Sequence, residues 1–356
     1  MNNAVFAYTG NSVAIEAGLR GGNDVFKYTL GGNVSAGTRS LNANLGVGHD
    51  AFTLDATNRN FVNGSYLDVD VVGSAGNDTA NITVGQVLSS LVAIRANLGA
   101  DSDTSKLAFG NIDNGSSVDI DALLGNGTNT MTLDLNGVGK FDQADMSVTI
   151  LGGINTDKVA VNLHDDVGDG ITSSFLGINV GLGDGNDSFT AGLDYDGGSF
   201  RVDNFSVASI AVRGGTGSDV LVARGVGTTG NIHIDQGGLL DINFKGESGN
   251  DTLSMNFGKP DALFLEGRLR INLDGGSEND VITTLFSNTS TTNGKYDVTV
   301  LGGAGNDQVT FALNNNGGTP TFGPLGKVVL NGGGGVDTLM NANAAVSLAT
   351  FFETIL

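Results

Sequence analysis

The chain has 356 residues and no cysteine, and its 17 Lys and Arg against 38 Asp and Glu give a formal net charge of −21. This charge excludes a basic surface for nucleic acid and disfavours binding to anionic lipid. The 39% hydrophobic content excludes disorder, and the 57 glycines with only three prolines favour many tight turns joining regular strands.

A glycine-rich turn that ends in an acidic or amide residue recurs twelve times along the chain. Its clearest copies are GGTGSD (214–219), GGAGND (302–307) and GGGGVD (332–337). We call the last residue of each turn its closing residue. A repeat of about 28 residues is too short to bury a core alone, so neighbouring repeats must stack. The closing residues are Asp24, Asp50, Asp78, Asp103, Asn129, Asp157, Asp187, Asp219, Asp251, Asp280, Asp307 and Asp337.

Alternating apolar residues flank these turns on both sides. Two lie seven and nine residues before the closing residue, and two more lie two and four residues after it. This period-2 alternation predicts a strand with one buried face on each side of the turn, and no apolar stripe at helical spacing persists. In chain order, the clearest pairs are Phe52 and Leu54, Met131 and Leu133, Ile178 and Val180, Ile210 and Val212, Ile242 and Phe244, Leu253 and Met255, Ile271 and Leu273, and Val298 and Val300.

The segment that returns to the next turn varies in length and sometimes carries a third alternating run, as at 231–235. Stacking each strand on its counterpart in the next repeat gives parallel sheets, and parallel crossovers are right-handed in nearly all cases. The sequence therefore predicts an all-β fold, a right-handed parallel β-helix (β-solenoid) of about twelve coils. We expect one domain over 1–356, with 1–14 as its N-terminal end and 344–356 as a C-terminal cap or docking strand.

The acidic residues keep a constant phase with the glycines. Stacking therefore aligns eleven carboxylates at about 4.8 Å spacing, which is repulsive unless a cation intervenes. Calcium takes six to eight oxygens from carboxylates and backbone carbonyls, and glycine permits the positive φ that turns carbonyls toward a metal. We therefore expect calcium as the cofactor, with one metal row whose ligands are Asp24, Asp50, Asp78, Asp103, Asp157, Asp187, Asp219, Asp251, Asp280, Asp307 and Asp337.

The turns resemble those of the repeats-in-toxin calcium-binding family, whose nonapeptide is G-G-x-G-x-D-x-U-x. The turns ending at Asp219, Asp307 and Asp337 match all four fixed positions, and the others miss one or more. The family's coils are shorter and carry a calcium turn at both edges. The single turn per coil in this chain implies a calcium row along one edge, held between successive coils and weakened around Asn129.

This resemblance implies a calcium-stabilised extracellular structural or adhesive protein, such as a bacterial filament, surface-layer or adhesin component. We expect end-to-end self-association through the unpaired β edges of the solenoid, and contact with a cell surface or polysaccharide. No apolar run is long enough to span a membrane, and no basic segment followed by an apolar one opens the chain. A conventional signal peptide is therefore not predicted.

The alternative is a carbohydrate-active enzyme, a polysaccharide lyase or epimerase, because such enzymes often have the same fold. The histidines His49, His164 and His233 lie far apart in the sequence, and no hydrolase or phosphate-binding motif occurs. No catalytic residue is therefore predicted. Convergence of three or more basic and acidic groups in one groove would favour the enzyme. The acidic loops at 164–169 and 194–196 are further candidates for metal and carbohydrate contacts, although turn composition explains both.

Overall fold

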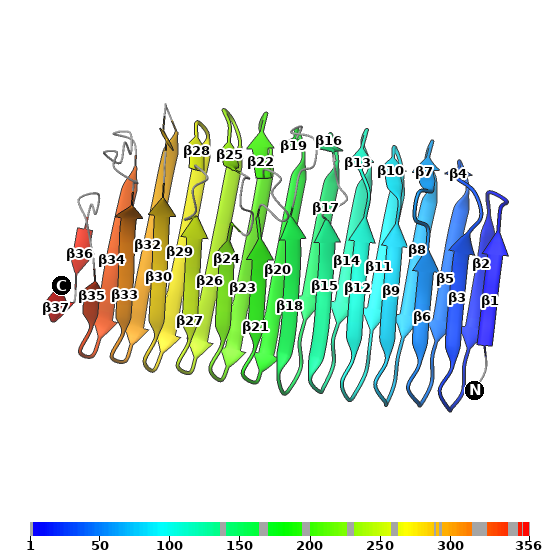
Figure 1. The fold of residues 1–356 in the computed structure, drawn as a ribbon, viewed down its shortest axis with the longest axis horizontal. Coiled ribbons are helices and arrows are strands. Elements are labelled where there is room, and N and C mark those ends of the chain that lie inside the picture. The colour runs from blue at the N-terminus through cyan, green and yellow to red at the C-terminus, as the bar shows by residue number, and fades with distance from the viewer. Residues whose placement is uncertain are drawn as a thin grey trace.

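The computed structural model describes residues 3–135, 140–163, 170–193, 200–225, 231–257, 263–287, 290–291, 294–314, 326–340, 348–350 and 352–355. These residues form 37 strands and no helix, and the strands build three parallel sheets. Successive coils lie side by side from the N-terminus to the C-terminus (Figure 1). The parallel β-solenoid predicted from the repeat is therefore confirmed.

Sheet A holds the strand that follows each glycine turn. Its fourteen strands pair in the order β1 (Asn3–Tyr8), β3 (Val25–Leu30), β6 (Ala51–Asp55), β9 (Thr79–Val84), β12 (Thr104–Phe109), β15 (Asn129–Leu135), β18 (Asp157–Leu163), β21 (Ser188–Gly192), β24 (Val220–Arg224), β27 (Thr252–Phe257), β30 (Val281–Ser287), β33 (Gln308–Asn314), β35 (Thr338–Met340) and β37 (Thr354–Ile355).

Sheet B holds the strand that leads into each turn. Its thirteen strands pair in the order β2 (Val13–Gly18), β5 (Thr38–Asn44), β8 (Tyr66–Val72), β11 (Leu91–Asn97), β14 (Ser117–Leu123), β17 (Asp145–Leu151), β20 (Phe175–Asp184), β23 (Val207–Thr216), β26 (Leu239–Ser248), β29 (Arg268–Ser277), β32 (Lys295–Ala304), β34 (Lys327–Gly334) and β36 (Leu348–Thr350).

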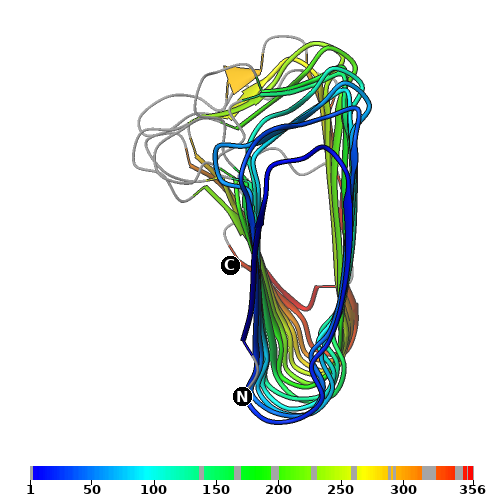
Figure 2. The ribbon, with the colours of Figure 1, turned by 90° about the vertical axis from the view of Figure 1, so that its right-hand side faces the viewer.

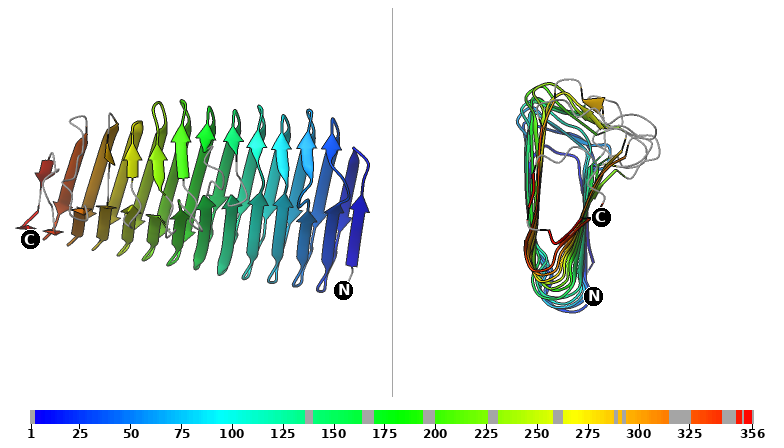
Figure 3. Two further views of the ribbon diagram at one scale, coloured as in Figure 1. Left: turned by 45° about the horizontal axis from the view of Figure 1, so that its top comes forward. Right: turned by 90° about the vertical axis from the view of Figure 1, so that its left-hand side faces the viewer.

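Sheet C holds the short strands of the return segment, along the edge opposite the glycine turns (Figures 1 and 3). The alternating run at 231–235 predicted one strand of sheet C. The other strands of this sheet are too short for an alternating pattern to predict them. Its ten strands are β4 (Val34–Ser35), β7 (Asn60–Val62), β10 (Gln86–Leu88), β13 (Ile112–Asp113), β16 (Phe141–Asp142), β19 (Ile171–Thr172), β22 (Phe200–Asp203), β25 (Ile232–Ile234), β28 (Leu263–Leu265) and β31 (Ser290–Thr291).

The inward residues of the sheets form one continuous apolar core along the rod. Viewed along the axis, the coils superpose into an elongated ring with the glycine turns at one narrow end (Figure 2). Identical positions of neighbouring coils stack, as the parallel rings of Phe26 and Phe52 do with centroids 5.3 Å apart. Because each buried Phe or Leu contributes about 1.5–3 kcal/mol, this core supplies the main stabilisation of the sheets.

The ends of the rod differ from its middle. At the N-terminal end, β1 is the outermost strand of sheet A, and its Val5 and Tyr8 are exposed while Phe6 packs on Phe26. At the other end, β36 pairs with β34 and β37 pairs with β35. The described part of 344–356 thus extends its own chain's sheets, and the rest of that segment lies outside the described residues.

Backbone conformation explains the glycines of the turn. The second residue before the closing residue has positive φ in all twelve turns, and nine of these residues are glycine. A Cβ on Gly217 would lie 1.6 Å from the carbonyl oxygen of Gly185 in the preceding coil. The three exceptions are Asp101, Asn155 and Glu278. Asp101 and Glu278 each accept a hydrogen bond from the amide of the preceding coil's equivalent glycine, at 2.9 and 2.8 Å.

Gly217→Ala should therefore destabilise the rod by about 1–3 kcal/mol, because it adds both an unfavourable φ and a contact with the preceding coil. Gly334→Ala is the matched control, since no atom lies within 4 Å of its Cβ position and its φ is ordinary. Urea unfolding followed by circular dichroism measures both variants. Equal midpoints for the two variants would contradict this account of the stacked turns.

Candidate functional site

The twelve closing residues form one buried column along the edge of the rod. Each is at most 2% exposed. The side-chain Oδ1 of one closing residue accepts a hydrogen bond from the backbone N–H of the closing residue in the preceding coil, as Asp251 does from Asp219 at 2.7 Å. All eleven such contacts measure between 2.6 and 3.3 Å. The structure thus brings together every aspartate that the sequence nominated, and we call this column the closing ladder.

The closing ladder ends at a residue that the repeat does not reveal. The Oε2 atom of Glu353 accepts the N–H of Asp337 at 2.6 Å, in the place of a further closing aspartate. Glu353 lies only 16 residues beyond Asp337 and outside any glycine turn. The periodicity of about 28 residues could not identify it.

The second carboxylate oxygen of most ladder aspartates has no hydrogen-bond partner. In turns that begin with glycine, such as those of Asp219, Asp251 and Asp280, this Oδ2 atom lies against that first glycine. On Gly214, for example, the Cβ position is 2.3 Å from Asp219 Oδ2 and 2.7 Å from the carbonyl oxygen of Gly246 in the next coil. Two oxygens therefore approach one point between the coils. The unpartnered oxygens belong to Asp50, Asp78, Asp103, Asp187, Asp219, Asp251, Asp280, Asp307 and Asp337.

Burial shifts the titration of the closing ladder. Desolvation raises the pKa of Asp103, Asp187 and Asp280 to about 7 and that of Asp251 to about 6. The hydrogen bond from the preceding coil opposes this rise in pKa, and the neighbouring carboxylates add to it. A buried carboxylate with an open oxygen is therefore costly near neutral pH unless a proton or a cation binds it.

The oxygen donors of the ladder, carboxylates and backbone carbonyls, are of the kind that calcium binds. Among the described residues, no three His, Cys, Asp or Glu side chains cluster closely enough to hold a metal. A cation between two coils would take an open Oδ2 and backbone carbonyls such as that of Gly246. Oxygen-only donors of this kind suit calcium.

Asn129 shows how the ladder accommodates a residue without charge. Its Oδ1 accepts from Asp103, while its Nδ2 donates to the carbonyl oxygens of Gly125 and Gly127 and to Asp157 Oδ1. An amide N–H group therefore takes the place of the open carboxylate oxygen. The weaker metal binding expected around Asn129 stays a prediction.

A second ladder runs along the exposed side of the same turns, which sequence reasoning did not interpret. Here the residue before the closing residue accepts a hydrogen bond from the amide of the following coil. Asn279 Oδ1, for example, accepts from Asn306 at 2.7 Å, and His49 Nδ1 accepts from Asn77 at 2.9 Å. The Asn-Asp pair that recurs at the end of the turns was the sequence signal for this ladder. His49 occupies the Asn position of its own turn and therefore belongs to the same ladder. The other acceptors are Asn23, Asn77, Asn186, Asn250 and Asn306.

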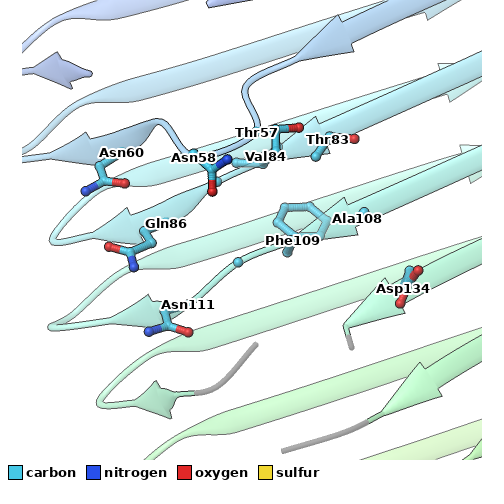
Figure 4. Close-up of a pocket in the computed structure, with 12 residues that line it drawn as sticks. Thr57, Asn58, Asn60, Thr83, Val84, Gln86, Ala108, Phe109, Asn111 and Asp134 are labelled. Atoms are coloured by element: carbon cyan, nitrogen blue, oxygen red, sulfur yellow. The ribbon is translucent and has the colours of Figure 1, made fainter. Parts of the chain in front are cut away.

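The outer face of sheet C carries further polar groups. In its N-terminal half, Asn60, Gln86 and Asn111 project from successive coils beside a hollow of about 640 Å³ (Figure 4). Asp134, which also lines this hollow, pairs with Lys106 at 3.1 Å. The lining is therefore dominated by neutral amide and hydroxyl groups.

In its C-terminal half, sheet C brings charged and aromatic groups into one hollow of about 690 Å³ lined by residues of β22, β25 and β28 and the turns that follow. Arg201 Nε contacts Asp235 Oδ2 at 2.7 Å, and the rings of His233 and Phe264 stack at 4.6 Å. Burial lowers the pKa of His233. We call this the charged hollow; its lining residues are Arg201, Asp203, Asn204, Phe205, His233, Asp235, Gln236, Gly237, Phe264 and Glu266.

The charged hollow meets the condition set for the enzyme alternative, because basic and acidic groups converge there. His233 lies in the alternating run at 231–235, but the sequence did not predict that Arg201 lies opposite it in the register. The intervening coil has 32 residues, and its irregular segment hides the alignment. The acidic loops at 164–169 and 194–196 lie outside the described residues.

Comparison with known proteins identifies no relative, since no family model, curated protein or solved structure matches the chain. The likeness to repeats-in-toxin turns therefore rests on the turn motif alone. Within the described part of the chain, no helix has the length and hydropathy needed to cross a membrane.

Substitutions at Asp251 separate the hydrogen bond of the ladder from its charge. In calcium-free buffer at pH 5.5, below the folded-state pKa of about 6 for Asp251, the rod should remain folded. Under these conditions Asp251→Asn should match or exceed the wild type in stability, because its amide keeps the acceptor and adds a donor, as Asn129 does. Asp251→Ala leaves the Asp219 N–H buried without a partner and should lose about 1–3 kcal/mol. Urea unfolding of both variants tests this. Equal losses would show that the ladder hydrogen bond contributes little.

The raised pKa values predict the pH dependence of the calcium-free protein. A folded-state pKa of about 7 lies above the usual value near 4, so the folded protein binds more protons between these limits. The free energy of unfolding should therefore fall as pH rises from about 4 to about 7. Circular dichroism of the protein in chelator, recorded as the pH rises from 5 to 7, measures the folded fraction, and Asp280→Asn should reduce its fall. A folded fraction that rises toward pH 7 would contradict the prediction.

Proposed function

We propose that the protein is a calcium-stabilised extracellular rod with a structural or adhesive role, such as a bacterial filament, surface-layer or adhesin component. The observation that carries the proposal is the closing ladder with its nine buried, unpartnered carboxylate oxygens. These oxygens recur in register along one edge, where a row of divalent cations would balance much of the net charge of −21. The absence of cysteine supports stabilisation by metal in place of disulfides.

The architecture of the rod supports a mechanical or display role. Three parallel sheets run through consecutive coils, so each coil contacts only its neighbours and the molecule is long rather than globular. The outermost strand β1 presents backbone groups together with exposed Val5 and Tyr8. An edge of this kind suits end-to-end association with a second copy.

Calcium would contribute stability comparable to that of a whole domain. For sites with Kd near 10⁻⁴ M, free calcium at about 1 mM adds roughly 1.4 kcal/mol per site by linkage. Nine such sites together contribute on the order of 13 kcal/mol, within the usual range of total domain stability. Without calcium, the open oxygens must be protonated or remain buried and charged.

Removal of calcium should therefore unfold or strongly loosen the rod at neutral pH. We expect a chelator to remove most of the β signal in circular dichroism, and calcium, but not magnesium at equal concentration, to restore it. Asp219→Asn and Asp251→Asn together should reduce the number of ions bound in isothermal titration calorimetry. A spectrum and melting temperature unchanged by chelator would refute the calcium proposal while leaving the rod fold intact.

A carbohydrate-active enzyme is the second candidate, and the charged hollow is the observation that favours it. Asp203 and Asp235 occupy neighbouring coils beside Arg201 and His233, so acid and base groups lie within one strand spacing. Incubation with polyuronates and neutral polysaccharides, followed by a reducing-end assay and absorbance of unsaturated products, tests this candidate. No product from either polymer class would exclude it for those substrates.

A further inference from the structure

Phe205 adopts a backbone conformation that its residue type disfavours. Asn204 and Phe205 have φ of 45° and 65°, in the turn between β22 and β23. Turns of this shape prefer Asn-Gly, and a bulky side chain at positive φ is a local outlier. The corresponding turns of other coils read Asn63-Gly64-Ser65 and Asn114-Gly115-Ser116, so Phe205 stands where those coils have glycine.

The phenyl ring of Phe205 is not needed for the core, because the residue is 88% exposed. It lies on the rim of the charged hollow, beside Gly237 of the next coil. A Cβ on Gly237 would lie 3.0 Å from the backbone nitrogen of Phe205 and 3.3 Å from its Cδ1. An exposed aromatic ring held at local conformational cost indicates selection for a contact outside the fold.

A second aromatic ring lies in the same hollow. Phe264 stacks on His233 with the two ring planes only 10° apart, and both project from the outer face of sheet C. Phe205 and Phe264 therefore offer apolar surface at two places in a polar recess. Recesses of this composition bind ligands that combine apolar faces with hydroxyl groups.

The polar groups of the hollow indicate the charge of the ligand. Arg201 is engaged by Asp235 at 2.7 Å, while Asp203 has a buried Oδ1 without a hydrogen-bond partner. Asp203, Asp235 and Glu266 outnumber the single arginine, so the hollow repels carboxylated polymers. The buried Oδ1 of Asp203 is closed to a ligand, whereas the exposed carboxylate of Glu266 can accept hydrogen bonds from hydroxyl groups.

We propose that the charged hollow binds a neutral glycan, with Phe205 and Phe264 packing on sugar faces and the exposed carboxylate of Glu266 accepting a hydroxyl hydrogen bond. This inference supplies the adhesive part of the proposed function with a site and a ligand class, and it rests on that function. It does not depend on calcium in the closing ladder. The amide-lined hollow near Gln86, on the same face of sheet C, offers neutral groups for a longer chain.

Phe205→Gly provides the test, because it should remove binding without harming the fold. Relief of the positive φ should raise the urea midpoint, while affinity for neutral polysaccharide falls by about tenfold, as loss of one aromatic contact predicts. Affinity electrophoresis of the full chain in calcium buffer, with laminarin, dextran and hydroxyethylcellulose as probes, measures retardation. Phe175→Ala, which removes an exposed ring from sheet B, is the matched control and should bind as the wild type does.

Two further probes decide the ligand class. Polygalacturonate and chitosan oligosaccharides present anionic and cationic chains. The three acids of the hollow should exclude the first, and any extra affinity for the second should disappear at high salt, whereas binding of the neutral probes should not change. The inference is overturned if no neutral glycan binds, if Phe205→Gly binds unchanged, if only a charged polymer binds, or if the wild type cleaves the polymer. Binding that persists in chelator with an intact circular dichroism spectrum would retain this inference while refuting the calcium proposal.

Discussion

The hydrogen bond between a closing carboxylate and the backbone amide of the preceding coil is the contact on which the rest of the rod depends. It buries an acidic side chain in every coil except the one with Asn129, and it sets the position of the turn that follows. Because the donor is the backbone N–H of another closing residue, the contact propagates from coil to coil. Glycines before it permit the turn, and apolar residues after it begin the next strand of sheet A.

In this arrangement, the acidic side chains that are costly to ionise are the buried carboxylates of the ladder. The exposed acids, such as Asp68 and Asp297, pair with arginines on the sheet faces. Nine of the ladder acids instead keep a buried second oxygen that has no hydrogen-bond partner among the described residues. Desolvation, more than mutual repulsion, accounts for the raised pKa of Asp187 and its neighbours. A cation or a proton would stabilise these nine carboxylates, and the two differ in their dependence on pH.

The sequence predicted the fold and the membership of the ladder because both depend on period. Glycine turns at a constant phase and apolar alternation around them specify which residues stack, without knowledge of the returning segment. The inward direction of Asp219, and the engagement of its Oδ1 by a backbone amide, depend on turn geometry that the motif does not encode. The charged hollow was not predicted, because Arg201 and His233 are aligned only by the pairing of two strands, which are four and three residues long. The role of Phe205 was not predicted, because Phe205 is unusual only when its turn is aligned with the corresponding turns of other coils, which have glycine at that position.

The two ladders at the turn edge run in opposite senses, which has a mechanical consequence. Asp50 accepts a hydrogen bond from a backbone amide of the coil before it, whereas Asn23 accepts one from a backbone amide of the coil after it. Side chains of both coils therefore bond across the same interface. A force along the long axis of the rod is shared by these side-chain hydrogen bonds and by the backbone hydrogen bonds of the three sheets. Such an interface resists separation until many bonds yield together, and the rod would then lengthen by one coil in a single step. Under tension the rod would therefore not lengthen gradually. It would lengthen in steps, each of which releases one repeat.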